Sequence, residues 1–153
     1  RSGLVRDRLP EYPGIKVLAE HVAKFPGATE SCRSAMENFL IAHSKIDGVW
    51  AAWDELTMGT VQAIESTGRK GIICVGIDGN LSTFDAIRRK SPFKMTIAPD
   101  WEGGVQTAVY QLENYLWKGK PATSSQFYIA IPIITINNCP PPGYYYNTEE
   151  VYK

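Results

Sequence analysis

The clearest change from one kind of secondary structure to another lies in residues 48–59, which read GVWAAWDELTMG. Residues 48–53 are an uncharged run without alternation of polar and apolar side chains, which is typical of a strand buried on both faces of a parallel sheet. Asp54 is a residue type that favours the start of a helix, and helical spacing of apolar residues follows it as far as Gly68. This stretch therefore predicts a buried strand that leads directly into a helix.

The same alternation extends along the chain in both directions. Further strands are predicted at residues 15–19, 72–77, 93–98 and 127–136, and further helices at residues 32–40, 82–90 and 101–117. Thr29 or Ser31 is expected to cap the first of these helices, and Asp100 the last. Strands joined by helix-length connections predict an α/β fold, with a parallel sheet that helices cover on both faces.

The composition is that of a globular protein: of 153 residues, 44% are hydrophobic and 21% charged. Sixteen Lys and Arg balance sixteen Asp and Glu, and without a basic cluster no nucleic-acid-binding face is expected. No apolar run reaches the length of a membrane span. Cys32, Cys74 and Cys139 are interpreted as free thiols, with a Cys32–Cys139 disulfide as the alternative. No motif predicts a metal or a cofactor.

Polar and aromatic side chains follow the predicted strands at their carboxyl ends. They are Glu20-His21, Trp53-Asp54, Asp78-Gly79 and Pro99-Asp100-Trp101. Ligands of open parallel sheets bind beyond these ends, so we expect the residues to share one edge. Carboxylates accept hydrogen bonds from vicinal hydroxyl groups, and indole rings cover the apolar face of a sugar. The edge therefore predicts a site for a small, neutral, polyhydroxylated ligand.

Each of these residues also has a structural interpretation. Asp54 and Asp100 could be helix N-caps, and Asp78 could belong to a turn. Trp53 and Trp101 could be core residues. An acid/base role for an Asp54–Asp78 pair is a further alternative. Because the sequence lacks a nucleophile elbow and a phosphate-binding loop, an enzyme is not predicted.

Three blocks of this sequence, in this order, resemble the second half of ribose-type sugar-binding proteins of ABC importers. They are residues 53–59 (WDELTMG), 75–79 (VGIDG) and 96–98 (TIA). The family form is Asn-Asp-Glu with a Gly four residues later, then Val-Gly-Phe-Asp-Gly, then Ala-Thr-Ile-Ala-Gln. The 25 residues that separate Trp53 from Asp78 match the spacing in the family.

The resemblance, which covers about residues 1–137, implies roles for individual residues. Asp78 corresponds to the family's Asp that accepts bonds from sugar hydroxyl groups, and Trp53 to its ligand-binding Asn. Arg1 resembles the Arg of an Arg-x-x-Gly-Phe helix, and Pro99 or Asp100 stands where the family often has Gln. These replacements imply a sugar or polyol other than ribose. The predicted ligand-binding set is Arg1, Trp53, Asp54, Asp78, Pro99, Asp100 and Trp101.

The resemblance also implies the type I periplasmic binding protein fold, of which this chain would be the C-terminal half. Residues 1–99 would form the second lobe without its first strand, and residues 100–127 would belong to the first lobe. Residues 128–138 would return to the second lobe, and residues 139–153 would form a Pro/Tyr-rich tail.

The function implied is that of a solute-binding component of a bacterial ABC importer, located in the periplasm or anchored outside the membrane. The expected partners are a small sugar or polyol, a membrane permease, and either the missing lobe or another copy of the chain. One alternative is the effector-binding domain of a LacI-type transcriptional regulator. A sugar-modifying enzyme is the less favoured alternative.

Overall fold

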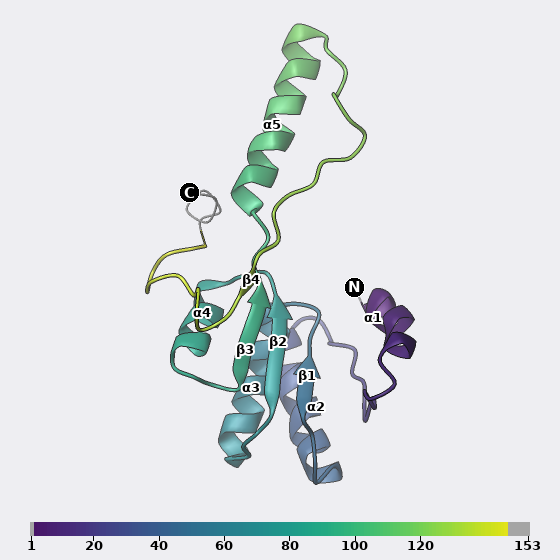
Figure 1. Ribbon diagram of the computed structural model, residues 1–153, viewed down its shortest axis with the longest axis vertical. Helices are drawn as coiled ribbons and strands as arrows, with labels where there is room; N and C mark the ends of the chain where they lie inside the picture. Colours follow the sequence, from purple (N-terminus) through teal and green to yellow (C-terminus); the bar gives the residue numbers. More distant parts are fainter. Residues whose placement is uncertain (1, 147–153) are drawn as a thin grey trace.

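Four strands and five α-helices follow one another in the computed structural model, which describes residues 2–146 (Figure 1). The helices are α1 (Ser2–Arg8), α2 (Ala28–Ala42), α3 (Asp54–Thr67), α4 (Leu81–Arg88) and α5 (Trp101–Lys118), and a 3-10 turn covers Leu9–Glu11. The strands are β1 (Gly48–Trp50), β2 (Ile73–Ile77), β3 (Phe93–Ile97) and β4 (Ile133–Ile134). None of the helices within residues 2–146 combines the length and the apolar character needed to cross a bilayer.

The strands form one sheet in the order β1-β2-β3-β4. β1, β2 and β3 pair in parallel, with Val49 opposite Cys74 and Gly76 opposite Thr96. β4 pairs antiparallel to β3, with Ile134 opposite Thr96. The predicted α/β class and the mostly parallel sheet are therefore confirmed. β4 runs the other way because the chain returns beside β3 directly from the end of α5, without a crossover helix.

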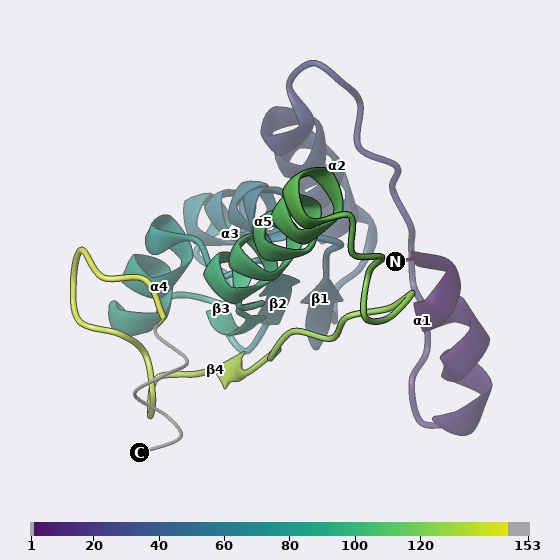
Figure 2. The ribbon, with the colours of Figure 1, turned by 90° about the horizontal axis from the view of Figure 1, so that it is seen from above.

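Helices α2, α3 and α4 all lie on the same face of the sheet (Figure 2). Their buried side chains form the main core with the inward-facing residues of the strands, among them Met36, Val61, Ile64, Cys74 and Phe93. Burial raises the pKa of the Cys74 thiol to about 12, so this cysteine behaves as a small apolar residue. All three cysteines are free thiols, as predicted.

The opposite face of the sheet is not covered in the described part of the chain, so the prediction of cover on both faces was wrong. Ile73 on this face is 50% exposed, and Ile133 is 54% exposed. Helix α1 lies beyond the β1 edge of the sheet, and α5 extends away from the sheet altogether (Figures 1 and 2). Neither helix is therefore placed to pack on this face.

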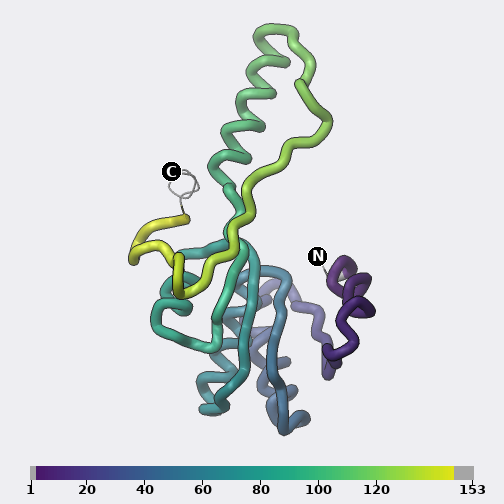
Figure 3. Tube along the Cα trace, in the orientation of Figure 1, coloured from purple at the N-terminus to yellow at the C-terminus, as the bar shows by residue number. Residues whose placement is uncertain are grey.

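Two predicted strands are largely absent from the structure, and β1 ends at Trp50, three residues before the predicted limit. Residues 15–19 are irregular, because a strand needs backbone partners and the described part of the chain pairs no strand with this segment. The strand predicted at 127–136 is reduced to β4, since its first residues run back beside α5 (Figure 3) and residues 136–138 form a turn.

The helix starts also test the predicted caps. The Asp100 carboxylate accepts the backbone N–H of Gly103 at 3.0 Å, so the predicted cap of α5 is confirmed. Helix α2 begins earlier than predicted, after Gly27 and without a side-chain cap, and the Ser31 hydroxyl instead accepts the backbone N–H of Lys24. Asp54 does not cap α3 either, because it is the first residue of the helix and its carboxylate bonds elsewhere.

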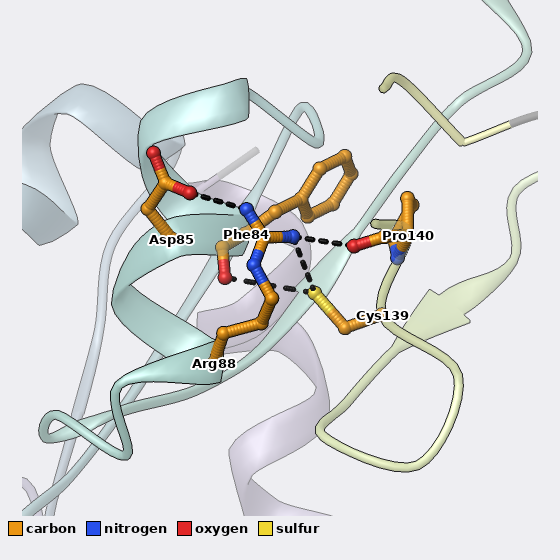
Figure 4. A network of polar contacts seen from close by, with 5 residues as sticks. All are labelled: Phe84, Asp85, Arg88, Cys139 and Pro140. Carbon is orange, nitrogen blue, oxygen red and sulfur yellow. Dashed lines mark hydrogen bonds and ion pairs between the residues drawn. The ribbon is translucent and has the colours of Figure 1, made fainter. Parts of the chain in front are cut away.

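The segment after β4 is joined to α4 by polar contacts of Arg88 and Cys139 (Figure 4). The Arg88 guanidinium bonds to the Asp85 carboxylate and to the Pro140 carbonyl, and one of its nitrogens lies 3.7 Å from the Cys139 sulfur. The Cys139 thiol donates to the Phe84 carbonyl at 3.6 Å, and burial raises the pKa of this thiol. The start of the Pro/Tyr-rich tail therefore packs against α4.

Helices α2 and α3 approach each other most closely at Gly59. A Cβ atom at this position would lie only 2.2 Å from the Thr29 carbonyl oxygen and 3.2 Å from the Arg33 nitrogen. Both atoms belong to the backbone of α2, so they cannot move aside as a flexible side chain would. The packing of the two helices therefore requires a residue without a side chain.

We expect Gly59→Ala to lower the free energy of unfolding by about 2 kcal/mol, measured by urea denaturation. The gain in helix propensity, roughly 1 kcal/mol, is smaller than the cost of forcing the helices apart. Gly3→Ala in α1 is the matched control, because a Cβ atom there meets nothing within 4 Å. Equal stability of the Gly59 and Gly3 variants would contradict the close approach.

The C-terminal end of α2 is held by a side chain from the far end of α3. Arg69 donates from Nη1 to the Leu40 carbonyl at 2.9 Å and to the His43 carbonyl at 2.7 Å, and from Nη2 to the Ser44 carbonyl at 2.6 Å. These carbonyl groups lie in and just after the last turn of the helix, where they lack partners within it.

Replacing Arg69 by Ala should lower the free energy of unfolding by about 2 kcal/mol, because three charge-assisted hydrogen bonds are lost. Arg8→Ala is the control, since the exposed Arg8 side chain pairs with the exposed Glu11, and its loss should change stability by no more than about 0.5 kcal/mol. Thermal or urea unfolding of both variants gives the comparison. If both variants lose the same free energy of unfolding, Arg69 does not stabilise the end of α2.

Candidate functional site

The parallel pairing of β1, β2 and β3 brings the carboxyl ends of these strands to one edge of the sheet, the edge from which α5 departs (Figure 1). The residues predicted from the strand ends 50–54, 77–79 and 97–101 therefore gather there. Arg1, also predicted to contact a ligand, lies outside the described residues.

Asp78 and Trp101 are joined directly at this edge. The Trp101 indole Nε1 donates to the Asp78 carbonyl at 3.3 Å, and the Asp78 backbone N–H donates to the Ile97 carbonyl at 2.8 Å. The φ angle of Asp78 is +133°, a conformation that L-residues seldom adopt. Trp101 remains 54% exposed. The loop after β2 and the start of α5 therefore present a carboxylate-bearing residue and an indole ring side by side.

Trp53, directly before α3, forms an aromatic pair with Phe25. The ring centroids are 6.1 Å apart and the ring planes are inclined by 28°, which is a stacked arrangement. Phe25 is 71% exposed, whereas Trp53 is half-buried. Trp53 is therefore neither a pure core residue nor an isolated surface ring.

Asp54 is fully buried, and the chain itself uses its carboxylate. Oδ2 accepts the backbone N–H groups of Gly79 at 2.9 Å and Asn80 at 3.1 Å, and Oδ1 accepts the Thr96 hydroxyl at 2.7 Å. A carboxylate with no exposed surface cannot reach a ligand at the edge. In this arrangement it is also unable to act as one half of an acid/base pair with Asp78.

Pro99 and Asp100 are half-buried at the junction between β3 and α5. The Asp100 backbone N–H donates to the Ala130 carbonyl at 2.9 Å, and its carboxylate caps α5. The Pro99 carbonyl accepts the Trp101 N–H at 2.8 Å. This junction therefore fixes where α5 leaves the lobe, and any ligand contact by these two residues stays a prediction.

Sequence reasoning missed Phe25 as a member of this edge. The residue stands in an irregular loop before α2, so it did not follow a predicted strand. An available signal was an aromatic residue directly before the Pro26-Gly27 turn that leads into a helix. Thr96 was missed as well, because its partner Asp54 lies 42 residues away along the chain.

The edge combines carboxylate and indole groups on an open surface. Such groups can bind hydroxyl groups and the apolar face of a sugar ring. Two surface hollows of the described residues lie elsewhere, one beside α1 (Leu4, Val5, Arg8, Leu9, Tyr12, Ile15) and one beside the end of α4 (Ile87, Lys90, Phe93, Lys94, Ile136). Neither includes a residue of the edge, which forms one wall rather than an enclosed pocket.

Comparison with known proteins gives relatives over most of this chain. It is 33% identical to the D-apiose import binding protein of Actinobacillus succinogenes over 120 residues, which cover 78% of this chain and 38% of the relative. It is 30% identical to the xylitol-binding protein of Mycolicibacterium smegmatis over 132 residues, which cover 85% of this chain and 36% of the relative. The chain thus spans less than half the length of these relatives.

The fold has matching solved structures. A periplasmic solute-binding protein of an ABC transporter from Actinobacillus succinogenes, solved with bound D-allose, superposes with a TM-score of 0.78 and 25% identity. The match covers 90% of this chain and 46% of that protein. Residues 1–121 match the family described as the periplasmic binding protein domain. With its fold and most of its sequence matched in this way, the chain belongs to the periplasmic binding protein domain family.

Proposed function

We propose that the protein containing this chain is the solute-binding component of an ABC importer, and that it binds a small sugar or polyol at the edge formed by Asp78, Trp101, Trp53 and Phe25. The observation that carries the proposal is the hydrogen bond from the Trp101 indole to the Asp78 carbonyl, which joins an exposed aromatic ring to the backbone of a residue that bears a carboxylate. The names of the relatives, which refer to D-apiose and xylitol, support a pentose or a polyol as the ligand class.

The ligand contacts would divide between two kinds of group. The Asp78 carboxylate would accept hydrogen bonds from neighbouring hydroxyl groups, while Trp101, Trp53 and Phe25 would cover the C–H faces of the ligand. Arg1, at the start of the chain, would add a donor. We expect binding rather than catalysis, because the Asp54 carboxylate beneath the Asp78 loop is buried and bonded to the chain, and is therefore not free to act as an acid/base partner of Asp78.

A second wall for the ligand would come from another lobe. Small polar ligands are bound with most of their surface enclosed, and the edge of this lobe is open. Residues 1–99 and 128–138 would form the lobe described above, and residues 100–127 would pack on the other lobe. In support, α5 and the segment after it extend away from the sheet (Figure 3). Two chain segments connect α5 and the segment after it to the sheet, and they lie side by side. The Ala98 backbone N–H donates to the Pro132 carbonyl, and the Asp100 backbone N–H donates to the Ala130 carbonyl.

Two lobes joined by these segments would close over the ligand by a hinge motion. The closed form would then dock on a membrane permease. The protein would work in the periplasm, or outside the membrane on an anchor.

In the full-length protein, Asp78→Asn should weaken binding of the sugar by about 10- to 100-fold, because hydrogen bonds to a charged carboxylate are the strongest in such a site. Titration calorimetry with D-apiose, xylitol, D-ribose and D-allose measures the dissociation constant. Asp47→Asn is the matched control, since Asp47 is an exposed aspartate at the opposite end of β1 that pairs only with Lys45.

Two results would reject this assignment. An unaltered protein that gives no heat with any of these ligands would exclude the sugar or polyol class tested. An Asp78→Asn variant that binds as tightly as the Asp47→Asn variant would exclude Asp78 as a ligand contact.

The proposed layout also predicts how the isolated chain behaves. Helix α5 carries an exposed apolar stripe that includes Val105 (62% exposed) and Leu112 (56% exposed). We expect the chain alone to bind a hydrophobic dye and to associate, and the full-length protein to do neither, because the second lobe would cover the stripe.

A double variant, Val105→Glu with Leu112→Glu, should abolish most of the dye fluorescence of the isolated chain. Ile41→Glu, at an 85% exposed position on α2, is the control and should leave most of it. Sedimentation that finds the isolated chain as a single monomeric species without dye binding would count against this layout.

A further inference from the structure

Asp54 is a buried ionisable group that forms no ion pair with the described residues. None of the ion pairs found among residues 2–146 includes it, and its relative exposure is 0%. A buried carboxylate is strongly unfavourable unless hydrogen bonds replace the lost water. Here that replacement consists of two backbone N–H groups, of Gly79 and Asn80, and the Thr96 hydroxyl.

The two backbone donors belong to the loop that presents Asp78. Asp78 has a φ angle of +133° and Gly79 one of +74°, so two consecutive residues have positive φ. This turn directs the N–H groups of Gly79 and Asn80 toward the same point, where they form a small anion-binding concavity. The Asp54 Oδ2 atom occupies that concavity. The turn that gives Asp78 its unusual φ angle is therefore the same turn that aims the two N–H groups at Asp54.

The surroundings leave the Asp54 carboxylate little freedom. A Cβ atom at Gly76 would lie 2.5 Å from its Oδ1 atom and 2.8 Å from the Phe93 ring. A Cβ atom at Gly79 would lie 2.5 Å from the Cβ atom of Ala98. The carboxylate is therefore enclosed between β2, β3 and the loop, and it cannot shift without moving one of them.

We propose that Asp54 is a positioning residue for the ligand-binding edge, acting through the loop of residues 78–80. Its carboxylate links the start of α3, where it stands, to the loop after β2 and to Thr96 on β3. The negative charge holds the two N–H groups inward, and this fixes the backbone of Asp78 from which the ligand-facing carboxylate would project. The same backbone supplies the carbonyl that accepts the Trp101 indole.

The variant Asp54→Asn is the sharpest test, because it keeps the shape of the side chain and removes the charge. The amide oxygen can accept from Gly79 and Asn80 only if its NH2 group faces the Thr96 hydroxyl, so the network survives in a weakened, neutral form. Thr96→Val is the second variant, since it removes the hydroxyl bond to Oδ1 and leaves Asp54 in place. Val61→Ala, in the core and away from the loop, is the control for loss of stability.

The first readout is hydrogen exchange of individual amides in the full-length protein, which needs no ligand. Asp54→Asn should lower the protection of the Gly79 and Asn80 amides at least tenfold relative to the Cys74 amide, and Thr96→Val should do so to a smaller extent. Val61→Ala should lower protection generally, without singling out the loop. If neither Asp54→Asn nor Thr96→Val changes the protection of the Gly79 and Asn80 amides relative to the Cys74 amide, the proposal is overturned.

The second readout, the dissociation constant for xylitol and D-apiose, rests on the proposed function. We expect Asp54→Asn to weaken binding about tenfold at a temperature where all variants are folded, and Val61→Ala to leave it unchanged. Equal affinities of the two variants would refute an effect of Asp54 on binding. If the unaltered protein binds neither ligand while the exchange effect is present, the proposed function fails and the positioning role stands. Should Asp54→Asn not fold, Thr96→Val gives the same comparison.

Discussion

Parallel main-chain pairing of β1, β2 and β3 is the constraint on which the rest of this structure depends. The register places Gly48, Val49 and Trp50 opposite Ile73, Cys74 and Val75 in turn, and β3 continues it along β2. Because parallel strands all point the same way, the loops that follow them must meet at one edge. The aromatic residues, the Asp78 loop and the start of α5 come together for this reason, although they are far apart along the chain.

The polar groups beneath the edge are satisfied by one another. The conformation of Asp78, with φ of +133°, carries a backbone strain of about 1–3 kcal/mol. Hydrogen bonds to a buried carboxylate are worth about 1.5–3 kcal/mol each, so the bonds from Gly79 and Asn80 to Asp54 can offset that strain. A conformation that would be unfavourable in an isolated turn is thereby maintained where the site needs it.

The same lobe leaves two apolar surfaces without cover in the described residues, namely the outer face of the sheet, which bears Ile73, and the stripe of α5. Both fit a chain that spans less than half the length of its relatives. The core on the helical side is complete without them, since Val61, Ile64 and Phe93 are fully buried there. This part of the chain therefore has its own core, while the proposed ligand-binding edge has only one wall.

Local sequence signals determined most of the elements of this protein and the α/β class. Helical periodicity, Asp100 and the glycines at positions 68 and 119 set helix limits that the structure reproduces closely, because caps and periodic apolar residues act over a few neighbours. Residues 15–19 and 127–136 had strand-like composition without becoming long strands. A strand depends on a partner that the local sequence does not contain.

The role of each site residue was decided by the tertiary structure. Asp54, Asp78 and Asp100 have the same local pattern, an aspartate after a strand, yet one is a buried acceptor, one lies in a strained loop and one caps a helix. Phe25 joined the edge only through its stacking on Trp53. The sequence determined which chemical groups reach this edge of the sheet. Only the folded structure decided what each group contacts, because burial and hydrogen-bond partners come from residues distant in the chain.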